Sequence, residues 1–180
     1  SRPVRRDRAR WARAESRAMT TDASSPAGTD TDLVIHHKPA SLNSFTVDAP
    51  EGTSRFSVKL HLGLGKESWT FSAPDGTEAA VMVRPPMHAH PTFTLDRPGR
   101  ATVTIRKANF APMRESWRIE GTEFGDLDVS GDLADHEFAI ADATGTVVGR
   151  ASRAWASIRE TYVVRCSGID PVTAAAAAIA

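Results

Sequence analysis

Ser44-Phe-Thr-Val47, Ser68-Trp-Thr-Phe71, Thr92-Phe-Thr-Leu95 and Ser116-Trp-Arg-Ile119 are copies of one short pattern, whose aromatic residues lie 24 positions apart. Glu137-Phe-Ala-Ile140 and Thr161-Tyr-Val-Val164 extend the series to six copies. Apolar and polar residues alternate within each copy, which is typical of a β-strand with one face in the core. A pattern that recurs along the chain in this way predicts a repeated strand unit.

A turn and a second strand are predicted after the aromatic strands. Asp75-Gly76 and Asp142-Ala-Thr-Gly145 have turn composition, because glycine accepts the positive φ that lets a chain reverse. The second strands are Arg55–Leu60, Ala79–Val83, Ala101–Arg106, Asp126–Ser130 and Thr146–Ser152. With a first strand at Leu33–His36 the total is twelve, and many short strands at even spacing predict a barrel or a sandwich.

The C-terminal segment is predicted to be a helix. Asp170 can cap its N-terminus, Pro171 suits its first turn, and five consecutive alanines follow Thr173. Such a helix is apolar on every side, so it should be buried all round. Its small side chains fit the interior of a narrow barrel. The predicted fold is therefore mostly β, a twelve-stranded barrel that encloses a C-terminal apolar helix.

Composition limits the class of protein. The chain has 180 residues, 22 Lys and Arg against 22 Asp and Glu, and one cysteine, Cys166. A neutral chain is not a globally basic nucleic-acid binder, and one cysteine allows neither an internal disulfide nor a cysteine-based zinc site. No apolar run approaches the ~20 residues of a membrane-spanning helix. We expect a cytoplasmic domain, either free or peripheral at a membrane.

The N-terminal segment differs from the rest of the chain. Residues 1–18 contain seven arginines, and residues 20–31 are small and polar like a linker. We expect a disordered Arg-rich tail and linker over residues 1–31 and a folded domain over residues 32–180. A transit peptide and translated sequence upstream of a start at Met19 are alternative explanations of the arginines.

Residues 131–180 resemble the LURP-one-related proteins. The resemblance rests on Gly131–Asp142, on Gly145–Trp155, on Glu160-Thr-Tyr162 and on Asp170-Pro171. That family belongs to the Tubby C-terminal-like superfamily, together with the phospholipid scramblases. The resemblance implies a Tubby-like twelve-stranded barrel around a central helix. It also implies a non-enzymatic role, because members of the superfamily are not established enzymes. Tubby domains bind phosphoinositide head groups, and scramblases act on lipids.

Three side-chain groups are candidates for a metal site or a nucleophile. Asp126–Glu137 has the spacing of a twelve-position calcium loop, but the alternating Leu127 and Val129 favour a strand with a solvated face. His88-Ala-His90 lacks a third ligand and favours a plain hairpin loop. Cys166 lies in a strand pattern and is expected to be buried and inert. We predict no catalytic residue, no metal and no cofactor.

Basic residues beside the aromatic strands are the candidates for a ligand site. Arg106 and Lys107 belong to one repeat, and Arg150 and Arg153 lie at a related place in another. Alternation directs Arg106 and Arg150 away from the core, where the four residues could hold a lipid phosphate. We therefore expect a module that binds anionic phospholipid or a membrane surface. A solvated barrel exterior on a structural or protein-interaction domain is the alternative, and the oligomeric state is left open.

Overall fold

A computed structural model describes residues 30–38, 44–63, 65–86, 90–111, 114–132, 137–153 and 161–180. Within them, twelve strands precede one helix, α2 (Pro171–Ile179). The strands are β1 (Asp30–His37), β2 (Ser44–Asp48), β3 (Ser54–Gly63), β4 (Lys66–Ser72), β5 (Glu78–Arg84), β6 (Thr92–Asp96), β7 (Val103–Ala111), β8 (Arg114–Thr122), β9 (Gly125–Asp132), β10 (Glu137–Asp142), β11 (Val147–Arg153) and β12 (Thr161–Ser167).

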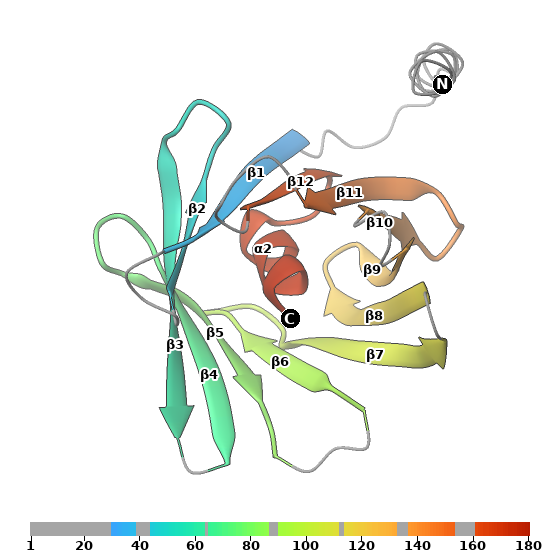
Figure 1. Ribbon diagram of the computed structural model, residues 1–180, viewed down its shortest axis with the longest axis horizontal. Coiled ribbons are helices and arrows are strands. Elements are labelled where there is room, and N and C mark those ends of the chain that lie inside the picture. The colour runs from blue at the N-terminus through green and yellow to red at the C-terminus, as the bar shows by residue number, and fades with distance from the viewer. Residues whose placement is uncertain are drawn as a thin grey trace, which may run out of the picture.

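The strands form a closed antiparallel barrel in which each strand pairs with the next along the chain (Figure 1). β1 closes the barrel by pairing with β12, from Asp30 opposite Ser167 to His36 opposite Thr161. Closure leaves none of the twelve described strands at a free sheet edge that could pair with another chain. The predicted twelve-stranded barrel is confirmed. β1 begins at Asp30, two residues before the predicted start of the folded domain.

The six-copy repeat forms two layers of side chains inside the barrel. All its aromatic residues lie on even-numbered strands and pack against the core; they are Phe45, Trp69, Phe93, Trp117, Phe138 and Tyr162. The residue two positions after each aromatic has almost no exposed surface; these are Val47, Phe71, Leu95, Ile119, Ile140 and Val164. The repeat therefore supplies a fully buried ring of mainly aliphatic residues beneath a ring of aromatic residues.

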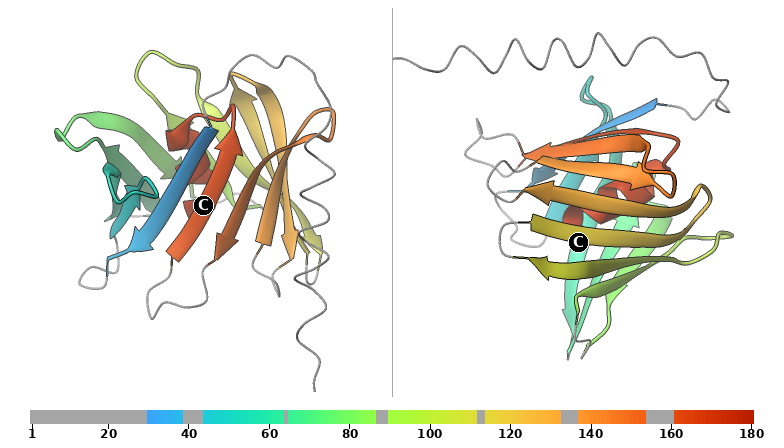
Figure 2. Two further views of the ribbon diagram at one scale, coloured as in Figure 1. Left: turned by 90° about the horizontal axis from the view of Figure 1, so that it is seen from above. Right: turned by 90° about the vertical axis from the view of Figure 1, so that its right-hand side faces the viewer.

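α2 runs inside the barrel, as the strands around it in Figure 2 show. Asp170 caps its N-terminus by accepting hydrogen bonds from the backbone N–H groups of Val172 and Thr173, at 3.1 and 3.3 Å. Val172–Ala176 is buried, whereas Ala177–Ala180 is only half-buried. The prediction of a capped, enclosed helix is confirmed for its first turns. Among the described residues, no helix has the length and apolarity needed to cross a bilayer.

Candidate functional site

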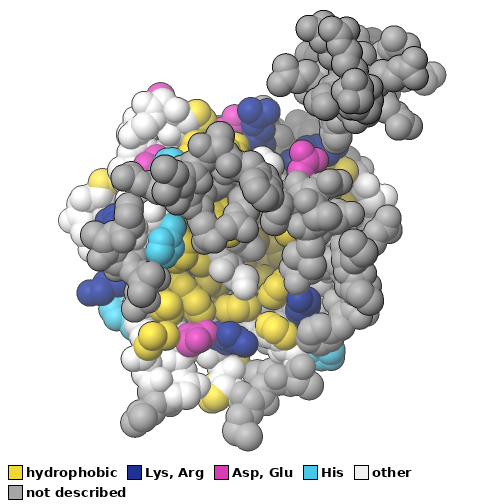
Figure 3. All heavy atoms as spheres, viewed as in Figure 1, with side chains coloured by type: hydrophobic (Ala, Val, Ile, Leu, Met, Phe, Trp, Pro, Cys, Tyr) yellow, Lys and Arg dark blue, Asp and Glu magenta, His cyan; other side chains and the backbone are white. Residues whose placement is uncertain are grey.

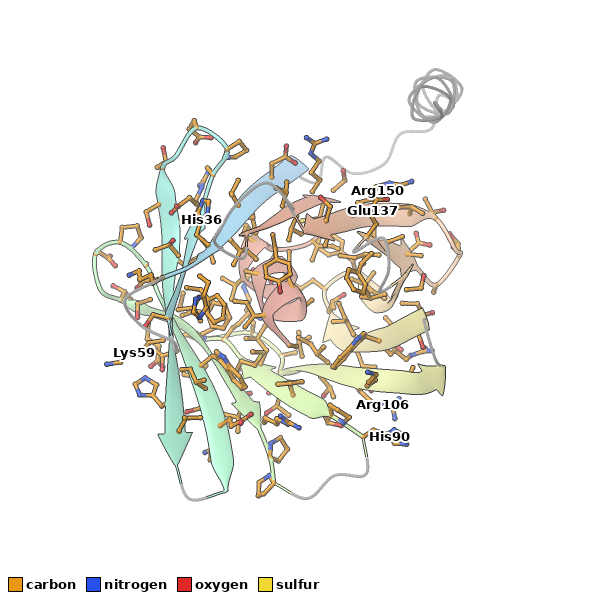
Figure 4. All side chains as sticks on the ribbon, in the orientation of Figure 1. His36, Lys59, His90, Arg106, Glu137 and Arg150 are labelled. Carbon is orange, nitrogen blue, oxygen red and sulfur yellow. The ribbon has the colours of Figure 1, made fainter. Side chains whose placement is uncertain are left out.

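Two of the four predicted cations, Arg106 and Arg150, lie on strands that are not neighbours. Arg106 projects outward from β7 and pairs with Glu120 at 2.5 Å, whereas Arg150 projects outward from β11. Three strands, β8, β9 and β10, separate them around the barrel, and Figure 4 shows the two arginines well apart. The structure does not bring Arg106 and Arg150 together, because sequence spacing does not show how far apart two strands lie around a closed barrel. The side chain of Arg153 lies outside the described residues.

Lys107 has a different environment from its neighbour Arg106. Successive residues of a strand point to opposite faces, so Lys107 lies on the same face as the core. Its ammonium nitrogen lies 5.6 Å from the centre of the Trp117 ring, which is directly opposite in the β7–β8 register. This distance suits a cation–π contact. Lys107 therefore belongs to the mouth of the barrel rather than to its outer wall.

The calcium-loop pattern falls largely on a strand. Asp126 and Asp128 lie on β9, where Leu127 and Val129 between them are buried. Both carboxylates face Arg118, at 3.3 and 3.7 Å, so a cation already balances them. The predicted strand with a solvated face is confirmed. No group of three His, Cys, Asp or Glu side chains able to hold a metal occurs within the described ranges, and His88 lies outside them.

The two ends of the barrel carry opposite charge. We call the end with the aromatic ring the aromatic end and the end where Asp170 caps α2 the capped end. Charged residues described at the aromatic end are Lys38, Lys59, Lys66, Arg84, Arg106 and Lys107 against Glu67 and Glu137, with His36, His37, His61 and His90 nearby. Those at the capped end are Asp32, Asp48, Glu51, Asp75, Glu78, Asp96, Glu123, Asp126, Asp142 and Asp170 against Arg55, Arg97, Arg100, Arg150 and Arg165. Cations prevail at the aromatic end and acids at the capped end.

The mouth at the aromatic end is apolar. Trp69 lies 5.6 Å from Phe93, and Phe93 lies 6.1 Å from Trp117, measured between ring centres. Trp117 and Tyr162 are half-buried, so part of each ring reaches the surface. In Figure 3 hydrophobic side chains form the floor of a hollow, and Lys, Arg and His side chains lie around it together with a few Asp or Glu side chains. The aromatic end therefore combines apolar rings with a basic rim.

A groove of about 740 Å³ lies at the capped end of the barrel. It is lined by the β2–β3 connection and by β11 and β12, including the buried residues Gly149 and Cys166 of these two strands. Arg150 lines it together with two arginines that we did not predict, Arg55 and Arg165. Alternation places Arg165 outside the barrel, but only the β11–β12 register shows that it lies directly opposite Arg150. Sequence reasoning alone does not supply that register.

Comparison with known proteins agrees with this architecture. The family model of LURP-one-related proteins matches residues 31–180. The chain belongs to the LURP-one-related family. Among solved structures, the X-ray structure of an Arabidopsis thaliana protein is similar to this domain, with a TM-score of 0.59 and 15% identity over 85% of this chain and 90% of that one. Among curated proteins, none matches. At 15% identity the structural likeness of this LURP-one-related domain shows the fold alone.

Proposed function

We propose that this LURP-one-related domain binds the surface of an anionic phospholipid membrane without catalysing a reaction. The observation that carries the proposal is the segregation of charge between the two ends of the barrel. The aromatic end, with its basic rim and partly exposed rings, faces the lipid. Of the four cations predicted from the sequence, Lys107 lies in this surface and Arg150 does not.

The physical basis is the attraction of cations to an anionic leaflet. Each Lys or Arg near such a surface contributes about 1 kcal/mol. Salt screens electrostatic interactions beyond roughly 8 Å. Whether the membrane attracts or repels the domain therefore depends on which end of the barrel faces the lipid. With the aromatic end toward the lipid, the acids of the capped end lie on the far side of the barrel. Tryptophan and tyrosine also favour the membrane–water interface, which suits Trp117 and Tyr162.

The test is co-sedimentation of the full chain with vesicles of neutral phosphatidylcholine, with and without a phosphoinositide, at low and physiological salt. In the first variant, Lys38→Gln and Lys66→Gln remove two exposed cations from the aromatic end. In the control variant, Arg100→Gln and Arg118→Gln remove two cations elsewhere. Two cations at about 1 kcal/mol each correspond to a loss of roughly thirtyfold in affinity. We expect that loss for the first variant only.

Both variants keep residues 1–31, so any binding by the Arg-rich segment is common to them. An equal loss in both variants would mean that total charge, and not the aromatic end, governs binding. If the wild-type chain does not co-sediment with phosphoinositide vesicles even at low salt, the lipid proposal fails. The domain would then be a structural or protein-interaction domain.

A further inference from the structure

We propose that the groove at the capped end binds the phosphate group of a small, soluble organic molecule. This site is separate from the proposed membrane surface, which lies at the other end of the barrel. The groove is lined by three arginines, Arg55, Arg150 and Arg165, against two acids, Asp32 and Glu51. Cations are in the minority elsewhere at the capped end, so their gathering around one hollow points to an anionic ligand.

The two central arginines oppose each other. Arg150 on β11 and Arg165 on β12 are direct partners in the strand register, and both side chains are exposed on the outer face. Like charges in directly opposite positions of a sheet repel each other. Asp32, on the other side of Arg165, reaches it only at 3.8 Å. An anion seated between the two guanidinium groups would turn this repulsion into attraction.

The remaining cations of the groove are available to a ligand. Among the described residues, neither Arg55 nor Arg150 has an ion-pair partner. Guanidinium groups bind phosphate through two parallel N–H donors, which makes arginine the side chain best suited to phosphate recognition. Three arginines around one hollow therefore suit a phosphate better than a singly charged carboxylate.

The size and walls of the groove indicate an organic phosphate rather than the bare ion. Pockets for small organic ligands commonly have volumes of about 300–1,000 Å³, and about 740 Å³ lies in that range. Pro50 and Pro171 line the groove, and so does Val147, whose side chain is otherwise an exposed hydrophobic residue. These apolar surfaces can cover the organic part of a ligand while the arginines hold its phosphate.

The surroundings favour a soluble ligand over a lipid head group. A bilayer is broad, so docking it at the capped end would bring the anionic surface against Glu51, Asp75, Glu78 and Asp142 as well as the groove. A small molecule meets only the residues that line the hollow. The same phosphate chemistry is thus accessible to a soluble ligand at a lower electrostatic cost.

Calorimetric titration of the full chain with phenyl phosphate and with inorganic phosphate tests this proposal. We expect saturable binding of phenyl phosphate that is tighter than that of the inorganic ion. Arg150→Gln should weaken it at least about tenfold, because a hydrogen-bonded charge is lost. The matched control is Arg100→Gln, which removes an exposed arginine paired with Glu123 outside the groove. The control should bind like the wild type.

Thermal unfolding without ligand supplies a second readout. Because Arg150→Gln removes one of two like charges at directly opposite positions, its melting temperature should equal or exceed that of the wild type. A lower melting temperature would contradict the repulsion on which the site rests. Absence of saturation by phenyl phosphate, or an equal loss in Arg100→Gln, would overturn the site. If binding to phosphoinositide vesicles is lost in Arg150→Gln, the ligand of the groove is a lipid head group and the proposal of a soluble ligand is wrong.

Discussion

Arg97 and Asp170 form a buried ion pair, with 2.5 Å between Nη1 of the guanidinium and Oδ2 of the carboxylate. The side chain of Arg97 is 5% exposed and that of Asp170 is 18% exposed. Arg97 follows β6 directly, and Asp170 is the N-cap of α2. Arg97 also donates to the carbonyl of Ala101 at 3.4 Å. One carboxylate thus joins the wall of the barrel to the start of the helix inside it.

Replacement of Asp170 by alanine should be among the most destabilising single changes in the domain. It leaves the Arg97 guanidinium buried without a counter-charge, which costs about 3–5 kcal/mol. It also removes the helix cap, at about 1 kcal/mol. Together these losses approach the whole stability of an ordinary domain, about 5–15 kcal/mol. Urea unfolding followed by circular dichroism measures the difference.

The partner change, Arg97→Met, should cost less. The carboxylate of Asp170 then keeps its hydrogen bonds from Val172 and Thr173, and methionine fills much of the arginine volume. We expect the free energy of unfolding to fall by about 1.5–3 kcal/mol, because a hydrogen bond between charged groups is lost. Equal destabilisation by the two single variants would contradict this asymmetry. Losses of unfolding free energy below about 1 kcal/mol in both variants would be typical of an exposed ion pair and would contradict the stabilising role of this buried pair.

Ala176→Asp tests the enclosure of α2. Ala176 is fully buried inside the barrel, so the new carboxylate would have neither water nor a partner. We expect a loss of several kcal/mol and an unfolded or insoluble protein. The control is Ala101→Asp, because Ala101 is exposed in the β6–β7 connection. A melting temperature for Ala176→Asp within a few degrees of the control would place the helix outside the barrel.

The sequence predicts the fold better than the site because the two depend on different information. Strand and helix identity follows from local periodicity, such as the alternation in Ser68–Phe71 and the alanine run after Thr173. The site depends on register and on distance around the barrel. Nothing in the spacing of Arg106 and Arg150 places three strands between them, or Arg165 beside Arg150. Charge segregation between the ends likewise appears only when the direction of every strand is known.

Gly131 illustrates how structure replaces one explanation of a residue with another. In the calcium-loop pattern it occupies the glycine of the sharp turn. In the barrel it lies on β9 directly opposite Phe138 of β10. A Cβ atom at Gly131 would overlap the Phe138 ring and lie 2.5 Å from the carbonyl oxygen of Glu137. The glycine therefore makes room for one of the aromatic residues of the repeat.

Gly131→Ala should therefore destabilise the domain to the same extent with and without calcium. Displacing the Phe138 ring and the β10 backbone is a form of overpacking, which costs about 1–3 kcal/mol. The control is Gly52→Ala, because nothing lies near a Cβ at Gly52 and the cost there comes from its positive φ alone. Thermal unfolding of wild type and variants is measured with calcium and with a chelator. A melting temperature of the wild type that rises with calcium would restore the calcium-loop explanation.

Asp142 should make the β10–β11 turn sensitive to acid. The Thr144 hydroxyl donates to its carboxylate at 2.6 Å, and the backbone N–H of Thr146 donates at 2.9 Å. These hydrogen bonds hold the pKa of Asp142 below its ordinary value of 3.8. A lowered pKa in the folded state means that the stabilisation is complete above about pH 4 and is lost as the pH falls through the lowered pKa. Asp142→Asn should therefore unfold more readily than the wild type at pH 7, and the two should converge in strong acid.

Thr144→Val removes the hydroxyl that contributes most to this effect. The pKa of Asp142, followed by NMR titration of its carboxyl carbon, should then rise toward its ordinary value. Asp75 is the internal control, because its own pKa is lowered by the backbone and hydroxyl of Thr77 in a different turn and should not move. Valine has nearly the shape of threonine, so the turn itself should persist and the backbone N–H of Thr146 should still donate. An Asp142 pKa that does not change in Thr144→Val would show that the backbone donors alone stabilise the carboxylate. The acid sensitivity of the turn would then depend on its backbone conformation rather than on the Thr144 hydroxyl.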